Sequence, residues 1–105
     1  MTEAETITSA DYRLNLIGVL ATAAGSREIH IQGPDGLSLS QLISQLLLRV
    51  ENQQFTDLLI DSATSNPLPN VIILLNDQDC NLFQGLKTRL EAGTTVTIIP
   101  VAHGG

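Results

Sequence analysis

The 105-residue sequence contains few of the side chains from which enzymes build active sites. It has one cysteine, three aromatic residues and two histidines, His30 and His103, which lie 73 positions apart. A zinc site needs three or four ligands held close together. The glycine-rich phosphate-binding motifs G-x-G-x-x-G and G-x-x-x-x-G-K-S/T are both absent, and nothing local supports a Cys80–His103 nucleophilic pair. The scarcity of these side chains and motifs predicts a chain that is not an autonomous enzyme and binds no metal or cofactor itself.

Basic residues are also scarce. Five Lys and Arg stand against eleven Asp and Glu, and the resulting charge of −6 disfavours direct binding to nucleic acids or anionic membranes. The longest apolar run, Val71–Leu75, is far shorter than the roughly 20 residues of a membrane helix. Residues 1–5 are polar and acidic, unlike a secretory signal, and one cysteine cannot form an internal disulfide. We therefore expect a cytoplasmic protein.

The N-terminal third of the sequence changes character near Tyr12. Residues 1–11 lack hydrophobic periodicity and are expected to form a flexible tail. The alternation of Leu14 and Leu16 with polar neighbours predicts a strand that continues to Leu20 and ends in a turn. Residues 27–32 alternate again, which predicts a second strand and therefore an N-terminal hairpin.

A helix is predicted to follow the hairpin. Ser38 and Gln41 have the spacing of a capping box, in which each side chain satisfies a free backbone N–H of the first helical turn. Apolar residues then recur with helical period on one side. They are Leu39, Leu42, Ile43, Leu46, Leu47 and Val50. We expect this stripe to form core against a sheet.

The second half of the sequence gives weaker signals. Residues 51–70 are expected to be irregular, with their apolar side chains packed underneath. Val71–Leu75 is a short continuous apolar run, which predicts a central strand covered, at least in part, on both faces. Residues 94–100 are rich in β-branched side chains and predict a last strand.

The order of these elements predicts an α+β fold of the β-grasp (ubiquitin-like) type. In this fold a mixed sheet of four to five strands curls around one main helix, and the last strand lies beside the first. The domain is expected to span residues 12–100, and residues 101–105 to form an extended tail that ends in Gly104 and Gly105. Glycine lacks a Cβ, so such a tail can enter a channel too narrow for side chains, and its carboxylate is the one exposed reactive group we expect.

The C-terminal third resembles a known family. The residues that carry the resemblance are the strand Val71–Leu75, the N-D-x-D segment Asn76–Asp79, and the ending His103-Gly104-Gly105. They look like the ubiquitin-related modifier family and the prokaryotic sulfur carriers of the molybdopterin-synthase small-subunit and thiamine-carrier type. Before Val71 the resemblance is one of topology only.

The resemblance implies chemistry at Gly105. An adenylyltransferase of the ubiquitin-activating type would use ATP to convert the carboxylate to an acyl-adenylate. A persulfide from a sulfurtransferase would then leave a thiocarboxylate, whose sulfur goes to a tRNA base or a cofactor precursor. Alternatively, a lysine of a target protein would form an isopeptide bond. Val101, Ala102, His103 and Gly104 would be the residues that the activating enzyme recognises, with His103 serving recognition rather than proton transfer.

Several other residues have two interpretations each. Asp77 and Asp79 form either an Asx-type turn or a contact with the activating enzyme. Ile17 and Ile99 should point away from the core by strand alternation and form an exposed apolar patch for a partner. Lys87 is the only lysine, so self-conjugation through a side chain would require it, and a monomeric carrier or single-unit tag is favoured over a polymer.

The sequence leaves more than one interpretation for Cys80 and for the function of the whole chain. Cys80 is either a sulfur relay or, more simply, a small half-buried hydrophobic residue. His30 is expected to be an ordinary surface histidine. For the whole chain, the alternatives to a sulfur carrier are a small subunit of a molybdopterin-synthase-like complex and a plain β-grasp interaction domain.

Overall fold

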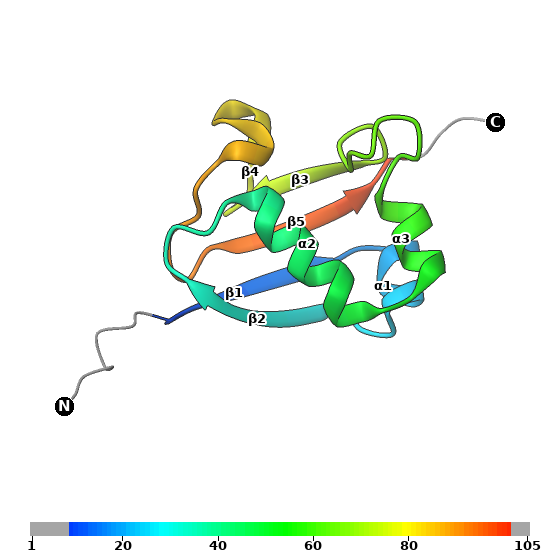
Figure 1. Cartoon of the computed structure of the whole chain (residues 1–105), viewed down its shortest axis with the longest axis horizontal. Coiled ribbons are helices and arrows are strands. Elements are labelled where there is room, and N and C mark those ends of the chain that lie inside the picture. The colour runs from blue at the N-terminus through cyan, green and yellow to red at the C-terminus, as the bar shows by residue number, and fades with distance from the viewer. Residues whose placement is uncertain (1–8, 102–105) are drawn as a thin grey trace.

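The computed structural model describes residues 9–101, which form one mixed sheet with helices packed on one of its faces (Figure 1). The strand order is β2-β1-β5-β3-β4, with β1 and β5 parallel and the other neighbours antiparallel. The strands are β1 (Ser9–Leu16), β2 (Glu28–Pro34), β3 (Val71–Leu75), β4 (Gln78–Asp79) and β5 (Thr95–Pro100). The helices are α1 (Val19–Ala24), α2 (Leu39–Val50), α3 (Gln53–Leu59) and the short 3₁₀ turns η2 (Cys80–Leu82) and η3 (Gly85–Lys87). The last strand lies between the first strand and β3, so the predicted β-grasp fold is confirmed.

The first strand begins earlier than the sequence pattern predicted. β1 starts at Ser9, and its residue Asp11 pairs with Gln32 of β2. Ala10 is buried. The expected boundary between tail and domain at residue 11 is therefore wrong for residues 9–11, because polar residues on the open side of a strand hide its period. Residues 1–8 of the expected tail lie outside the described residues.

The first strand also ends earlier than predicted, because Gly18 turns the chain. Its backbone angles, φ 60° and ψ −130°, belong to a region that is essentially restricted to glycine. The helix α1 begins directly after it and ends at Gly25, which has the left-handed conformation typical of a helix C-terminus. The expected continuation of the strand to Leu20 is therefore wrong. Leu20 belongs to α1 instead, and its side chain is buried.

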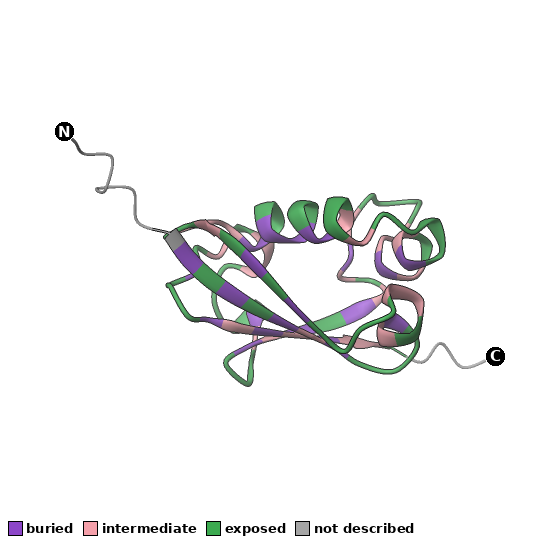
Figure 2. Ribbon diagram, turned by 90° about the horizontal axis from the view of Figure 1, so that it is seen from below, coloured by how far each residue is buried: buried purple, intermediate pink, exposed green. Residues whose placement is uncertain are grey.

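The helix α2 forms where the capping box predicts it. The Ser38 hydroxyl accepts a hydrogen bond from the Gln41 N–H at 3.1 Å, and the Gln41 side-chain oxygen accepts one from the Ser38 N–H at 3.0 Å. Its buried residues are Leu39, Leu42, Ile43 and Leu46. Figure 2 shows that these buried positions face the sheet while the other side of α2 faces solvent.

The segment between α2 and β3 is more regular than expected. The Asn52 side chain accepts a hydrogen bond from the Phe55 N–H and caps α3, and Phe55 and Leu59 are fully buried. The prediction of an irregular segment is wrong over residues 53–59, because seven residues are too few to display a clear helical period. The expected packing of Phe55 and Leu59 underneath the segment is confirmed.

The helices leave one face of the sheet open. On β3, Ile73 is fully buried but Ile72 is 43% exposed. The strand has neighbours on both edges, as predicted; its cover is complete on the helix side and only partial on the other, where Leu74 is half-buried and Ile72 exposed. The open face of the sheet is therefore where side chains are available to a partner.

Candidate functional site

Three isoleucines lie in one row across the open face of the sheet, two of them on β3 and β5 and the third directly after β1. Ile72 of β3 is directly opposite Ile99 of β5, and side chains of such antiparallel partners are in contact range. Leu16 is in register with Ile98, so Ile17, the next residue, comes beside Ile99. Ile17 is 43% exposed and Ile99 partly exposed. We call Ile17, Ile99 and Ile72 the isoleucine row.

The isoleucine row lies at the end of the sheet from which the C-terminal residues leave. Pro100 closes β5 opposite Val71, and the Val101 N–H donates to the Asn70 carbonyl oxygen at 2.9 Å. Val101 is therefore anchored to the fold and has an exposed side chain. Ala102, His103, Gly104 and Gly105 lie outside the described residues. Four extended residues span at most about 14 Å, so the Gly105 carboxyl group lies within that distance of Val101.

The turn at Gly18 extends the exposed apolar surface at the end of β5. A Cβ added at Gly18 would meet the Pro100 ring at 3.7 Å, so the turn lies directly against the end of β5. Val19, the first residue of α1, is 53% exposed. Sequence reasoning did not single out Val19 or Ile72, since it predicted a strand at the former and at least partial cover on both faces of the strand that holds the latter. The turn therefore adds Val19 to the exposed apolar surface at the end of β5, next to Val101.

Asp77 and Asp79 lie away from the isoleucine row. Asn76 and Asp77 both have positive φ and form the two-residue turn between β3 and β4. The Asp79 carboxylate accepts a hydrogen bond from the Asn81 N–H at 2.8 Å, an Asx turn that begins η2. This turn is at the opposite end of β3 from Ile72. The structure therefore favours the local turn interpretation and does not bring these aspartates together with Ile17 and Ile99.

Cys80 and Lys87 differ in accessibility. Cys80 is fully buried, and burial raises the pKa of its thiol, which disfavours the reactive thiolate. The structure thus supports Cys80 as a small hydrophobic residue of the core. Lys87 lies on η3 and is exposed, as an acceptor for conjugation would need to be.

Within residues 9–101, no group of three His, Cys, Asp or Glu side chains is arranged to hold a metal ion. In the same part of the chain, no helix is long and apolar enough to cross a membrane.

Comparison with known proteins identifies the family. Residues 14–105 match the sequence model of the ThiS family. The chain belongs to the ThiS family. This family groups the chain with ubiquitin-related β-grasp sulfur carriers, and the match includes the four residues after Val101.

Individual relatives agree with this assignment. The ThiS-family chain is 34% identical over 67 residues to ubiquitin-related modifier 1 of Schizosaccharomyces pombe, a match that covers 64% of this chain and 67% of that protein. It is similar to the solution structure of Urm1 from Trypanosoma brucei, with a TM-score of 0.72 and 25% identity, covering 93% of this chain and 98% of the other. The solution structure of the small archaeal modifier protein 1 from Methanosarcina acetivorans gives a TM-score of 0.76 at 19% identity, covering 93% and 99%. The resemblance drawn from the C-terminal third is thus confirmed over nearly the whole ThiS-family chain.

Proposed function

We propose that this ubiquitin-like sulfur carrier is loaded at the carboxylate of Gly105 by a separate, ATP-dependent activating enzyme. The observation that carries the proposal is the anchored end of β5, where the Val101 N–H binds Asn70 and the isoleucine row is exposed beside it. Family membership supports the role of the C-terminal glycine. The described residues supply recognition, and the reactive group is the main-chain carboxylate.

The proposed loading has three steps. First, an oxygen of the Gly105 carboxylate attacks the α-phosphorus of ATP; pyrophosphate leaves, and an acyl-adenylate remains. This step converts a carboxylate oxygen, a poor leaving group, into part of AMP, a better one. Second, the terminal sulfur of a persulfide on a sulfurtransferase attacks the acyl carbon and AMP leaves. Third, a thiol cleaves the resulting S–S bond, which gives the thiocarboxylate of Gly105 and a disulfide.

The isoleucine row is the proposed docking surface for the activating enzyme. Its exposed apolar area lies next to Val101, four residues before Gly105, so we expect the enzyme that reacts with the tail to cover or border this surface. The tail residues Ala102, His103 and Gly104 would enter the enzyme's channel, where small side chains allow close approach. The charge of −6 favours an enzyme with a basic surface around that channel.

Delivery of the sulfur completes the proposed function. A thiocarboxylate is a nucleophilic sulfur source, and we propose a tRNA base or a cofactor precursor in the cytoplasm as the final acceptor. The adenylate can also react with a lysine amine of a target protein, which gives an isopeptide bond. Lys87, as the single lysine, would be the acceptor side chain in any self-conjugate, and we expect the carrier to act as a monomer.

Intact-mass spectrometry tests the loading directly. The chain is incubated with ATP, its activating enzyme and a persulfide donor, and we expect a gain of about 16 Da because sulfur replaces oxygen. Omitting the persulfide should stop the reaction at the adenylate. A chain lacking Gly105 is the matched control and should show neither product. If the full-length chain forms no adenylate and its mass does not change, the proposal is wrong.

A further inference from the structure

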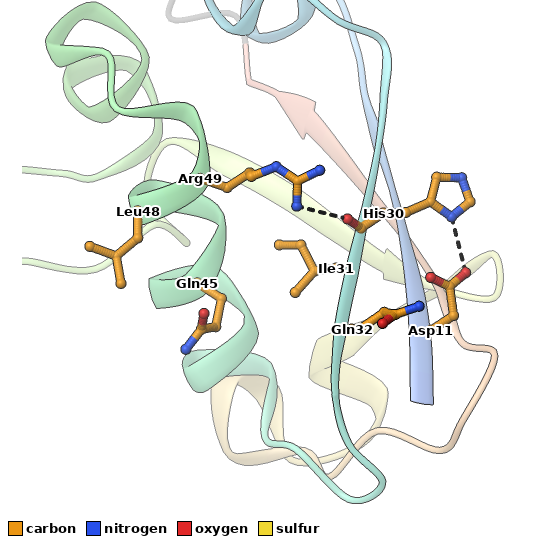
Figure 3. A pocket seen from close by; sticks show the side chains of 7 residues that line it. All are labelled: Asp11, His30, Ile31, Gln32, Gln45, Leu48 and Arg49. Atoms are coloured by element: carbon orange, nitrogen blue, oxygen red, sulfur yellow. Dashed lines mark hydrogen bonds and ion pairs between the residues drawn. The ribbon is translucent and has the colours of Figure 1, made fainter. Parts of the chain in front are cut away.

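His30 lies between two carboxylates on the open face of the sheet, on the outer strand β2, where it is opposite Arg13 of β1. Its Nδ1 is 3.0 Å from Asp11 Oδ2, which is on the neighbouring strand β1, and its Nε2 is 2.6 Å from Glu28 Oε2, two residues earlier on β2. Figure 3 shows the imidazole turned toward Asp11, on the far side of β2 from α2. The contact with Asp11 therefore joins the start of β1 to β2.

The protonation state of His30 follows from this arrangement. A neutral imidazole has one N–H donor and one acceptor nitrogen, whereas an ionised carboxylate only accepts hydrogen bonds. The neutral ring can thus satisfy one of the two carboxylates and must turn a lone pair toward the other. Only the imidazolium donates to both Asp11 and Glu28.

We propose that Asp11, His30 and Glu28 form a pH-sensitive clasp, in which the His30 imidazolium holds the first residues of β1 on β2 and its deprotonation releases one of the two contacts. The position is one where strand pairing begins, since β1 starts at Ser9, only two residues before Asp11. The clasp includes no residue of the isoleucine row or of the tail, so its test is separate from that of the proposed loading.

The charged groups around the clasp come from three elements. On β1, Arg13 lies opposite His30, and its Nε is 3.8 Å from Glu28 Oε2. From α2, Arg49 reaches over the edge of β2 and donates to the His30 carbonyl oxygen at 3.1 Å (Figure 3). These two cations moderate the effect of the carboxylates, and all the side chains are about half exposed, so solvent screens the interaction. The net effect is that the hydrogen bonds to Asp11, and then to Glu28, raise the pKa of His30 above 6.5.

The direction of the pH effect follows from that raised pKa. A group whose pKa is higher in the folded chain than in the unfolded chain stabilises the fold when it is protonated. The stabilisation by His30 is therefore fully present below pH 6.5 and is lost as the pH rises through the folded pKa. The clasp opens with increasing pH.

NMR titration of the two histidine rings tests the clasp in the full chain. We expect the His30 signals to titrate with a midpoint above 6.5 and Asp11→Asn or Glu28→Gln to lower it. The double variant should bring it to about 6.5, the value of an unperturbed histidine. The midpoint of His103 should not move in any of these variants. A wild-type His30 midpoint at or below 6.5, or one that neither substitution changes, would overturn the proposal.

Amide hydrogen exchange tests what the clasp holds. The Leu16 N–H donates to the Arg27 carbonyl oxygen, and antiparallel pairs alternate, so the amides of Ala10 and Tyr12 also point toward β2. Across the His30 titration, we expect the protection factors of these two amides to fall several-fold with rising pH. The His30→Asn variant should lack this pH dependence, and His103→Asn, the matched control, should retain it. Equal pH profiles in the wild type and His30→Asn would contradict the clasp.

Discussion

The two faces of the sheet use the same residue type for different purposes. Ile73 and Ile98 are fully buried beneath the helices, whereas Ile72 and Ile99, their neighbours in sequence, lie on the open face (Figure 2). Successive side chains of a strand point to opposite faces, so a single step along the chain changes an isoleucine's environment completely. Hydrophobicity alone therefore does not distinguish a core residue from a docking residue.

The difference shows where apolar surface remains to be buried. On the covered face the burial already stabilises the folded chain, and nothing is left for a partner. On the open face the isoleucine row keeps exposed apolar area next to the anchored residue Val101. We infer that the covered face determines stability and that the open face determines association. The predictions below test this division.

The largest expected effect is on the stability of the covered face. Ile73→Ala should lower the free energy of unfolding by about 2–5 kcal/mol, because it removes buried methyl groups and leaves a cavity. Ile72→Ala, the matched control on the next residue, should cost under about 1 kcal/mol because its side chain is already partly in water. Urea denaturation of both variants measures the difference. Equal losses would contradict the one-sided cover of β3.

The second prediction concerns association at the open face. Ile72→Asp should reduce kcat/KM for adenylation by about tenfold, or about 1.4 kcal/mol, because the partner loses an apolar contact and meets a desolvated charge. Gln32→Asp is the matched control, since it places the same charge on an exposed residue of β2, away from the isoleucine row. Adenylation rates at low carrier concentration measure both variants. If Gln32→Asp impairs adenylation as much as Ile72→Asp, the isoleucine row is not the docking surface.

A third, smaller effect is expected at the helix that covers the sheet. Ser38→Ala should destabilise the chain by about 1 kcal/mol, because the N-terminal hydrogen bonds of α2 are lost. Ser40→Ala, on the exposed side of the same helix, should change stability by less than about 0.5 kcal/mol. Thermal or urea unfolding compares them. Adenylation at a temperature where both variants are folded should be unaffected, and a selective loss in Ser38→Ala would show that the two faces are coupled.

The smallest expected effect separates charge from apolar contact in docking. Raising the ionic strength from about 0.05 to about 0.5 M should lower kcat/KM for adenylation a few-fold, since salt screens the attraction between the acidic carrier and a basic enzyme. The ratio between wild type and Ile72→Ala should stay constant over the same range, because an apolar contact is not screened. A ratio that changes with salt would indicate that the isoleucine row acts through a charged neighbour.

Local sequence signals predicted the elements whose determinants are local. The capping box of Ser38 and Gln41 and the apolar stripe that follows lie within a few residues of one another, so α2 was predictable in position and orientation. The helix α1 was not, because the residues around Gly18 also fit a strand, and only contact with Pro100 and the rest of the fold distinguishes the two. The helix α3 was missed because it is short.

The candidate site was predictable in part. Strand alternation was enough to place Ile17 and Ile99 on the face away from the core. Ile72 joins them only through the pairing of β3 with β5, which depends on residues more than twenty positions apart. Asp77 comes after the last residue of β3, at the end of the strand away from Ile72, so it does not join the isoleucine row.

The sequence by itself determined the class of fold and the course of α2, because each depends on neighbouring residues or on the order of elements. The tertiary structure decided which isoleucines stay exposed and that His30 lies between Asp11 and Glu28. These outcomes depend on strand register and on which face of the sheet the helices cover. Both are set by packing between segments distant in sequence, which no local pattern specifies.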